Sequence, residues 1–194
     1  MMTTPPEHFS PVPLEKSYRL LNHGPTVLVS AAYGGTSNVM AAAWACVLDY
    51  GQTPKLTVVL DKATRTRELL EASGEFALQL PTQSMTKLTV CVGTDSARDV
   101  PDKLIRHGVE LFTAPCSDVP LVAGCVGWLL CKRIAEPRNE QLYDLFIGEI
   151  FGAWADERVF SDGHWHFESA PDALRTIHHV AGGQFYAIGA PVIG

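Results

Sequence analysis

A chain of 194 residues is long enough for one domain with a substantial buried core, and its 46% hydrophobic and 19% charged residues are typical of a folded globular protein. The net charge of -6 argues against nucleic acid or an anionic membrane as a partner, and it favours a small molecule or another protein. The longest apolar stretch, residues 120–131, falls well short of a membrane span.

The cysteines and the N-terminus indicate a reduced, cytoplasmic protein. The five cysteines are widely spaced, and no pair has the C-x-x-C spacing of zinc fingers, iron–sulfur clusters or thioredoxin-type centres. The opening "MMTTPPEHFSPVPLEK" is rich in proline and lacks the apolar region of a signal peptide. We expect residues 1–15 to form an extended arm, disordered or packed on a partner subunit, and residues 16–194 to form a single domain.

The hydrophobic pattern predicts a mainly β protein with short helices. Gly34-Gly35 marks a hairpin turn, and residues 135–141 read as a polar turn between two long strands. The predicted strands are residues 26–33, 38–48, 55–60, 75–80, 120–134, 142–154 and 183–189. The predicted helices are residues 61–74, with Thr64 as N-cap and Gly74 at its end, 82–93 and 100–108. Long hairpins with few crossover helices favour an antiparallel barrel.

The best candidate for an anion site is "DKATRTRE", residues 61–68. A strand ends at Leu60, and Thr64 to Thr66 open the next helix, whose free N–H groups and partial positive charge favour a phosphate. Lys62 or Arg65 would add full charge, and the threonine hydroxyls would donate hydrogen bonds. The alternative for residues 61–68 is a capped surface helix with solvated charges. No Walker A loop or G-x-G-x-x-G motif is present, so any nucleotide site must be built differently.

"TSNVMAAAW", residues 36–44, is a second candidate. Asn38 offers both a hydrogen-bond donor and an acceptor, which suits a ring that carries C=O and N–H groups. Trp44, six residues later, is expected on the same face of the strand because side chains alternate. The alternative is a turn residue followed by a core tryptophan, and both interpretations stay open on these residues alone.

The remaining candidates are single residues. Lys103 could reach an anion in a neighbouring cleft, although a lone lysine on a short helix is usually solvated. Phe185 could line a flat ligand, although aromatic residues in a closing strand are more often core. His164 and His166 have no acidic or cysteine partner at ligand spacing, so no metal site is predicted.

Taken together and in order, these pieces resemble the flavin reductase-like family, which includes the flavoredoxins. The resemblance runs from about Leu28 to Gly189, and its most specific part is "PKLTVVLDKATRTRELLEASGEFALQLP", residues 54–81. It implies an antiparallel Greek-key split β-barrel that binds FMN. It also implies a homodimer with FMN near the subunit interface.

The resemblance also implies cofactor-binding residues. Lys62, Thr64 and Thr66 match the turn that holds the FMN phosphate, with Arg65 assisting, and Lys103 matches a lysine that closes over the cofactor. The strand beside the flavin ring is matched by Asn38, Trp44, Ala45, Cys46 and Val47, and Phe185 falls at the aromatic position near the C-terminus. The chain departs from the family where many members read Ser-x-x-Pro-Pro, because it reads "CVLDYGQTP", and that bears on the pocket over the ring.

The activity implied is hydride transfer from NADH or NADPH to N5 of bound FMN, with electrons passed on to free flavin, a protein or another acceptor. The flavin supplies the chemistry, so no catalytic acid–base pair is required. The alternatives are a flavoredoxin-like electron carrier without nicotinamide oxidase activity, and a related barrel that binds another ligand such as haem.

Overall fold

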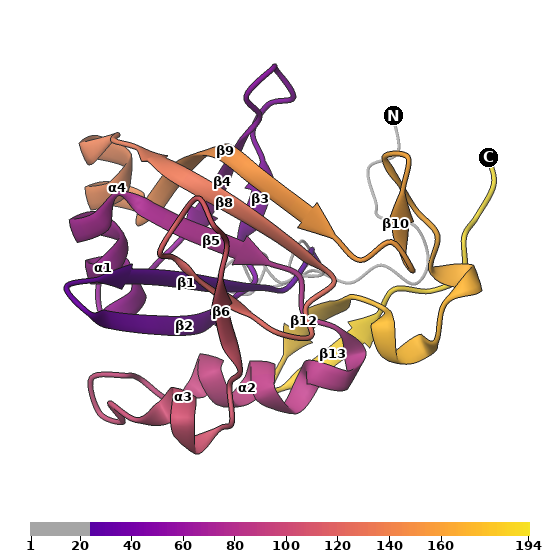
Figure 1. The fold of residues 1–194 in the computed structure, drawn as a ribbon, viewed down its shortest axis with the longest axis horizontal. Helices are drawn as coiled ribbons and strands as arrows, with labels where there is room; N and C mark the ends of the chain where they lie inside the picture. The colour runs from indigo at the N-terminus through magenta and orange to yellow at the C-terminus, as the bar shows by residue number, and fades with distance from the viewer. Residues whose placement is uncertain (1–23) are drawn as a thin grey trace, which may run out of the picture.

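The computed structural model describes residues 24–194, and its central element is a seven-stranded antiparallel sheet of order β2-β1-β5-β8-β9-β4-β3 (Figure 1). The predicted mainly β fold with short helices is confirmed. The sheet strands are β1 (Val27–Tyr33), β2 (Thr36–Ala42), β3 (Ala45–Val47), β4 (Lys55–Val59), β5 (Glu75–Gln79), β8 (Gly127–Ile134) and β9 (Leu145–Ala155). The predicted arm, residues 1–15, and the first part of the predicted domain lie outside the described residues.

The other elements surround this sheet. The helices are α1 (Arg65–Ser73), α2 (Thr86–Thr94), α3 (Lys103–Arg106) and α4 (Pro137–Tyr143), with short 3-10 turns η2 (Gln83–Met85), η3 (Phe167–Ser169) and η4 (Asp172–Leu174). Three small hairpins are built from β6 (Leu111–Thr113) with β7 (Pro120–Val122), β10 (Phe160–Ser161) with β11 (His164–Trp165), and β12 (Ile177–Ala181) with β13 (Gln184–Ala187). The predicted hairpin turn at Gly34-Gly35 is confirmed, with φ of +58° and +76°.

The two edges of the sheet are neighbours in sequence. β2 is one edge and β3 is the other, yet only Ala43 and Trp44 separate them. The sheet therefore has to curl until its edges meet at these two residues, which we call the seam. The prediction of one strand over residues 38–48 is wrong for this reason: the chain leaves β1 and turns onto β4 at the seam.

Packing of α1 against the inner face of the sheet makes the main core. Leu69 and Leu70 of α1 lie among buried side chains such as Phe76 and Phe146. A Cβ on Gly148 would lie 2.5 Å from the Phe76 ring, so glycine is required there for β9 to approach that ring. Gly74 ends α1 in the left-handed conformation, as predicted.

Two further predictions are wrong. Residues 120–134 form two strands in different sheets, because the chain turns at Gly124, whose φ is +89°, between β7 and β8. Residues 135–141, expected as a turn, mostly belong to α4. α4 has little apolar surface of its own, and it is fixed instead by charges: the Arg133 guanidinium pairs with buried Glu140 and lowers the pKa of that carboxyl.

A buried arginine joins α1 to α4 and β9. Arg67 donates to Glu71, to the Asp144 carboxylate, to the Glu140 backbone oxygen at 2.8 Å and to the Leu60 oxygen at 3.0 Å. Its guanidinium also lies 5.0 Å from the centre of the Phe146 ring. This cluster fixes the end of β4, and therefore the loop that leads into α1.

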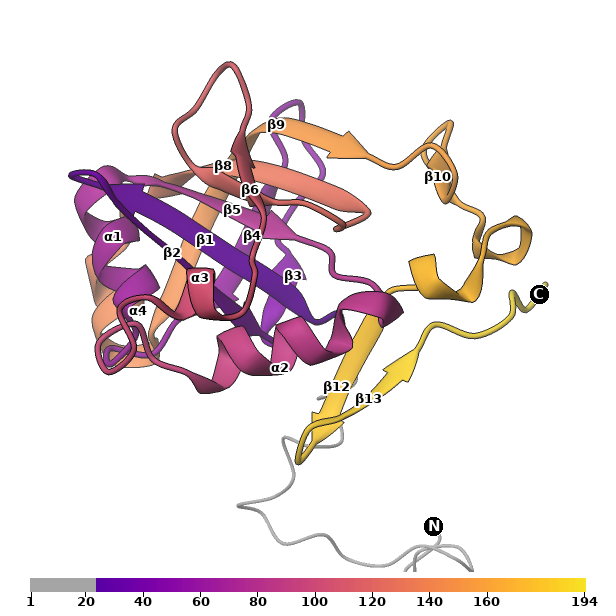
Figure 2. The ribbon, with the colours of Figure 1, turned by 60° about the horizontal axis from the view of Figure 1, so that its bottom comes forward.

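The β12–β13 hairpin lies beside α2, outside the sheet, in both views (Figure 2). It is docked by hydrogen bonds from the Thr26 N–H to the Ile177 oxygen at 3.1 Å and from the His179 N–H to Thr26 Oγ1 at 2.8 Å. This brings a segment near the C-terminus next to β2. Between residues 24 and 194 there is no helix of the length and apolarity needed to cross a membrane.

Candidate functional site

Three adjoining hollows follow β2 and share lining residues. The α1 hollow, of about 410 Å³, lies at the start of α1; the seam hollow, of about 270 Å³, lies at Ala43 and Trp44; the hairpin hollow, of about 220 Å³, lies against β12–β13. Met40 lines both the α1 hollow and the seam hollow, and Ala41 lines both the seam hollow and the hairpin hollow. The three therefore form one cleft with β2 as its common wall.

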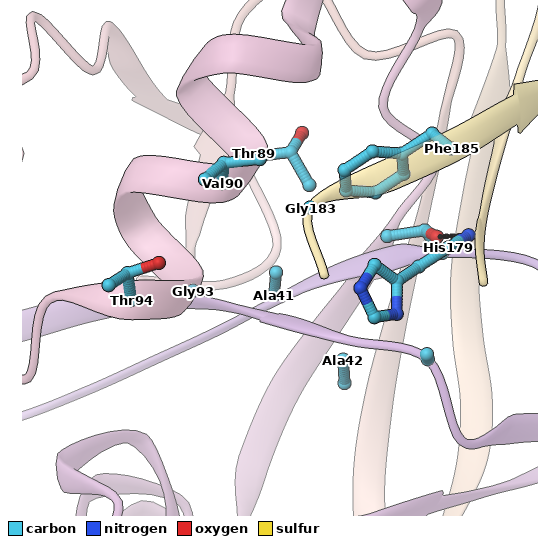
Figure 3. A pocket seen from close by; sticks show the side chains of 11 residues that line it. Ala41, Ala42, Thr89, Val90, Gly93, Thr94, His179, Gly183 and Phe185 are labelled. Atoms are coloured by element: carbon cyan, nitrogen blue, oxygen red, sulfur yellow. Dashed lines mark hydrogen bonds between the residues drawn. The ribbon is translucent and has the colours of Figure 1, made fainter. Parts of the chain in front are cut away.

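Small side chains form the middle of the cleft. Ala41 and Ala42 line it from β2, and Gly93 lines it from α2 (Figure 3). Ala43 of the seam continues the same wall. A Cβ on Gly93 would lie 3.0 Å from the Ala41 Cβ, so α2 packs directly on β2. A surface without protruding side chains suits a flat ligand.

Asn38 lies at the start of β2, where the cleft meets α1. Its side chain is only 2% exposed, and its Nδ2 donates to Thr66 Oγ1 at 2.9 Å. Its Oδ1 is buried and has no hydrogen-bond partner, and the residue lines the α1 hollow. A buried acceptor without a partner costs about 1–3 kcal/mol, which is recovered when a ligand donates to it.

The first turn of α1 faces the same hollow. Thr64 occupies the N-cap position as predicted, but its hydroxyl donates to the Asp61 oxygen at 2.8 Å and makes no cap hydrogen bond to the helix. The N–H groups of the first turn are thus left for another acceptor, and the helix end favours a negative one. The helix start predicted at residues 64–66 is present, and anion binding there stays a prediction.

Two arginines line the α1 hollow, and one carboxylate holds both. Arg65 Nη1 donates to Glu68 at 2.6 Å, and Arg98, from the loop after α2, donates to the other oxygen of Glu68. The hydrogen bond from Arg65 contributes most to lowering the pKa of Glu68, and the charge of Arg98 lowers it further. Positive charge is therefore held at the rim of the hollow before any ligand arrives.

Lys103 is buried, contrary to the expectation for a lone lysine on a short helix. It is 2% exposed, and its Nζ donates to the Val92 oxygen at 2.9 Å and the Asp95 oxygen at 2.8 Å, at the C-terminal end of α2. Burial lowers the pKa of Lys103 to about 8. It lines the α1 hollow, so its ammonium is available to an anion there as well as to α2.

Raising the pH above 8 is expected to stabilise the ligand-free fold through Lys103, whose pKa lies near 8 when folded and 10.5 otherwise. Between those values the unfolded chain holds a proton that the folded chain has released, so stability increases with pH. Urea unfolding at about pH 7.5 and about pH 8.5 measures the increment, below the range in which ionisation of Cys125 and Cys131 in the unfolded chain opposes it, since burial raises the pKa of both thiols to about 12. Lys103→Met should lose it and Lys62→Met, the control, should keep it; equal increments in wild type and Lys103→Met would contradict the assignment.

Lys62 does not join the site. Its Nζ donates to the Gln141 oxygen at 2.6 Å and lies 3.9 Å from Asp144, so the side chain reaches over α4 and lines none of the three hollows. The sequence placed it correctly in the loop before α1. The loop, however, turns its side chain toward the carbonyl end of α4.

The seam separates Trp44 from Asn38. Trp44 lines the seam hollow and is 54% exposed, whereas Asn38 is buried, so the expectation that they share one strand face is wrong. Ala45, Cys46 and Val47 form β3 on the far side of the seam and do not line the three hollows. They are next to the cleft, on the exposed edge of the sheet.

Phe185 does line the cleft. It comes from β13 and, with His179 of β12, walls the hairpin hollow opposite α2 (Figure 3). The two rings meet edge to face, with centres 5.1 Å apart. The sequence does not point to His179, Arg98 or Gly93, because they reach the cleft only through tertiary packing. The local signal for the cleft is the run of small side chains at residues 41–43.

An antiparallel sheet that curls until its edge strands meet, with a flat-walled cleft along β2, is a split β-barrel. The sequence model of the "flavin reductase like domain" matches residues 19–174, and the chain belongs to the flavin reductase-like family. The resemblance inferred from the sequence is thus confirmed.

Similar proteins agree in fold and length. A crystal structure of an FMN-binding domain of a flavin reductases-like enzyme from Shewanella baltica OS155 is 57% identical, with a TM-score of 0.86 over 95% of this chain and 96% of that one. The uncharacterized protein YddH of Escherichia coli K12 is 38% identical over 95% of this chain and 97% of its own length. Flavoredoxin of Desulfovibrio vulgaris (Miyazaki F), 24% identical, has the same split-barrel fold with a TM-score of 0.73 over 88% of this chain and 90% of its own.

Proposed function

We propose that the protein binds FMN in the cleft along β2 and acts as a flavin reductase-type oxidoreductase, taking a hydride from NADH or NADPH and passing electrons to free flavin or another acceptor. The observation that carries the proposal is Asn38 Oδ1, a buried acceptor with no partner, beside the open end of α1. FMN offers both groups that this place lacks: a phosphate for the helix end and N–H or hydroxyl donors for the amide oxygen.

The residues of the cleft fit FMN in its two parts. Thr64, Arg65 and Lys103 line the α1 hollow and would hold the phosphate through backbone N–H groups, hydroxyls and charge, while Thr66, buried behind them, would hold Asn38 in place. Arg98 joins this set, and Lys62 leaves it because its side chain lies over α4.

The flat ring would lie along the small side chains of β2, bounded by Trp44 at the seam and Phe185 at the hairpin. At the seam, the ring would also adjoin β3, which consists of Ala45, Cys46 and Val47. When bound, FMN supplies the two-electron chemistry. The chain positions the ring, excludes water from one side of it, and sets its potential by hydrogen bonds.

The absorption spectrum of the purified protein tests the activity. Flavin absorption that NADH or NADPH bleaches under anaerobic conditions, and that free flavin restores, is the expected result. A flavin that neither nucleotide bleaches would instead favour the electron carrier. A protein that cannot be loaded with FMN would exclude both functions and leave a barrel for another ligand such as haem.

Arg65→Ala is expected to weaken FMN binding about tenfold to a hundredfold, because a hydrogen bond to a charged group contributes about 1.5–3 kcal/mol. Riboflavin, which lacks the phosphate, should bind the variant and the wild type equally. Lys62→Ala is the matched control and should leave the FMN dissociation constant unchanged. Fluorescence titration measures all five constants; an equal loss for riboflavin would mean that Arg65 acts on the fold and not on the phosphate.

A homodimer in the cytoplasm completes the proposal. The edge beside the seam exposes Val47 at 74% and Tyr50 at 96%, a concentration of apolar side chains that favours contact with a second copy. All five cysteines are unpaired, which suits a reducing compartment. Sedimentation velocity gives the oligomeric state; a monomer at micromolar concentration would contradict the dimer.

A further inference from the structure

A fourth hollow, of about 730 Å³, shares no lining residue with the cleft. It lies between the ends of β8 and β9 and the β10–β11 hairpin, which stands beyond β9 in both ribbon views (Figures 1 and 2). Three tryptophans line it, Trp128, Trp154 and Trp165, and we call it the indole hollow. Nothing in the proposed flavin chemistry uses these residues.

Two of the indoles are cross-strand partners that the sheet fixes in place. Trp128 on β8 pairs with Trp154 on β9. Trp128 Nε1 donates to the Val122 oxygen at 3.0 Å, and its ring meets Phe112 edge to face at 5.4 Å. The Trp154 ring lies over Gly152, where a Cβ would come within 2.8 Å of it, so glycine makes room for the ring to lie on the strand.

The third indole is presented by the hairpin. Trp165 stacks on buried Phe167 with ring centres 5.0 Å apart and planes within 7°, and Phe160 meets its edge at 4.9 Å. Stacking covers one face of Trp165, and the residue is still 41% exposed. These contacts preorganise the rings, which lowers the entropy cost of binding a ligand on their free faces.

The charge around the indole hollow is negative. Glu157 and Asp162 line it, and its lining contains no lysine, arginine or histidine. Nearby Arg158 is already held by Asp156 through a two-point contact, which neutralises it. Among residues 24–194, no ion pair involves Glu157 or Asp162, and no lysine or arginine lies over the three indoles.

We propose that the indole hollow binds an organic cation with an apolar or aromatic body, such as a substituted ammonium or pyridinium compound. The faces of tryptophan rings attract cations more strongly than those of other aromatic residues, and the two carboxylates add coulombic attraction. A neutral ligand of the same shape would gain the apolar contact alone. The site is independent of FMN and stands whether or not the proposed reductase activity does.

Isothermal titration of the full chain with benzyltrimethylammonium tests the proposal. We expect saturable binding at one site with a dissociation constant on the order of 1 mM, as befits a few cation–π contacts on a small ligand. Benzyl alcohol and benzenesulfonate, the neutral and anionic probes, should bind at least about tenfold more weakly.

Two variants locate the binding. Glu157→Gln combined with Asp162→Asn keeps the shape, since asparagine tolerates the φ of +50° at residue 162, and should weaken the cation at least about fivefold. Trp165→Leu should do the same. Tyr143→Leu, at an exposed aromatic residue of α4 outside the four hollows, is the control and should leave the cation affinity unchanged; circular dichroism verifies each fold. The proposal is overturned by equal affinity for the three probes, or by the absence of saturable binding.

Discussion

Replacing Asn38 with leucine is expected to abolish tight FMN binding while leaving the ligand-free protein as stable as the wild type or more so. The substitution removes the unpartnered Oδ1 and puts an apolar side chain of similar size in a place that is 2% exposed. The fully buried Thr66 hydroxyl loses the donor that it has in Asn38, at a cost of about 1–3 kcal/mol, and the removal of the buried unsatisfied Oδ1 recovers a similar amount. We expect FMN affinity to fall at least about tenfold, because ligand donors then face a methyl group.

Fluorescence titration with FMN and thermal unfolding of the apoprotein measure the two halves of this prediction. Ser37→Ala, an exposed neighbour on β2, is the control and should change neither quantity. A destabilised apoprotein with unchanged FMN affinity would show that Asn38 serves the fold alone. An apoprotein that is not destabilised, together with weakened FMN binding, would show that Asn38 is kept for its ligand at the expense of stability.

Replacing Arg67 with methionine is expected to lower the free energy of unfolding by about 3–5 kcal/mol, the cost of breaking a buried charge cluster from one side. Methionine keeps much of the volume but leaves Asp144 and Glu71 without the guanidinium that joins them. The Leu60 and Glu140 carbonyls lose their donor as well. No other single exchange of a charged residue in the part of the chain we describe is expected to cost as much.

Urea unfolding at pH 7 gives the number, and Arg106→Met is the matched control. Arg106 makes a single ion pair at 3.5 Å with Asp102, and both side chains are more than half exposed, so we expect a change below about 0.5 kcal/mol. Adding Asp144→Asn to Arg67→Met should recover part of the loss, because it removes the stranded carboxylate. If the double variant is less stable than the single one, Asp144 stabilises the fold by itself.

The sequence predicts this fold well where each element carries its own signal. The strand at 55–59 is rich in β-branched residues, and α1 has an apolar face and a terminal glycine, so both come out within a few residues of their bounds. α4 has neither signal, because its stability comes from ion pairs and hydrogen bonds to neighbouring elements, with Arg133 on β8 and with Arg67 on α1, which is 73 residues from Glu140. The break between β2 and β3 at the seam has no sequence signal either. It follows from closure of the sheet and not from Ala43 or Trp44 themselves.

The site follows the same rule. Residues whose backbone makes the site, Thr64 to Thr66, are readable because a strand, a turn and a helix opening in sequence fix a helix end in space. Residues that would contribute their side chains to the candidate site are harder to predict from the sequence. Lys62 and Arg65 look equivalent there, and only the packing of α4 turns Lys62 away from the hollow. Arg98 has no signal of its own in the sequence. Only the structure shows its place, where it donates to one carboxylate oxygen of Glu68 while Arg65 donates to the other.

The carboxylate of Glu68 has a consequence for how the protein is made. Because it occupies both Arg65 and Arg98 before any anion is bound, the two cations do not repel each other across an empty cavity. If FMN binds here as proposed, the chain can fold before the cofactor arrives, and the incoming phosphate replaces Glu68 as the partner of the two arginines. Loading is then an exchange of one negative partner for another, and the ligand-free protein stays folded and able to bind.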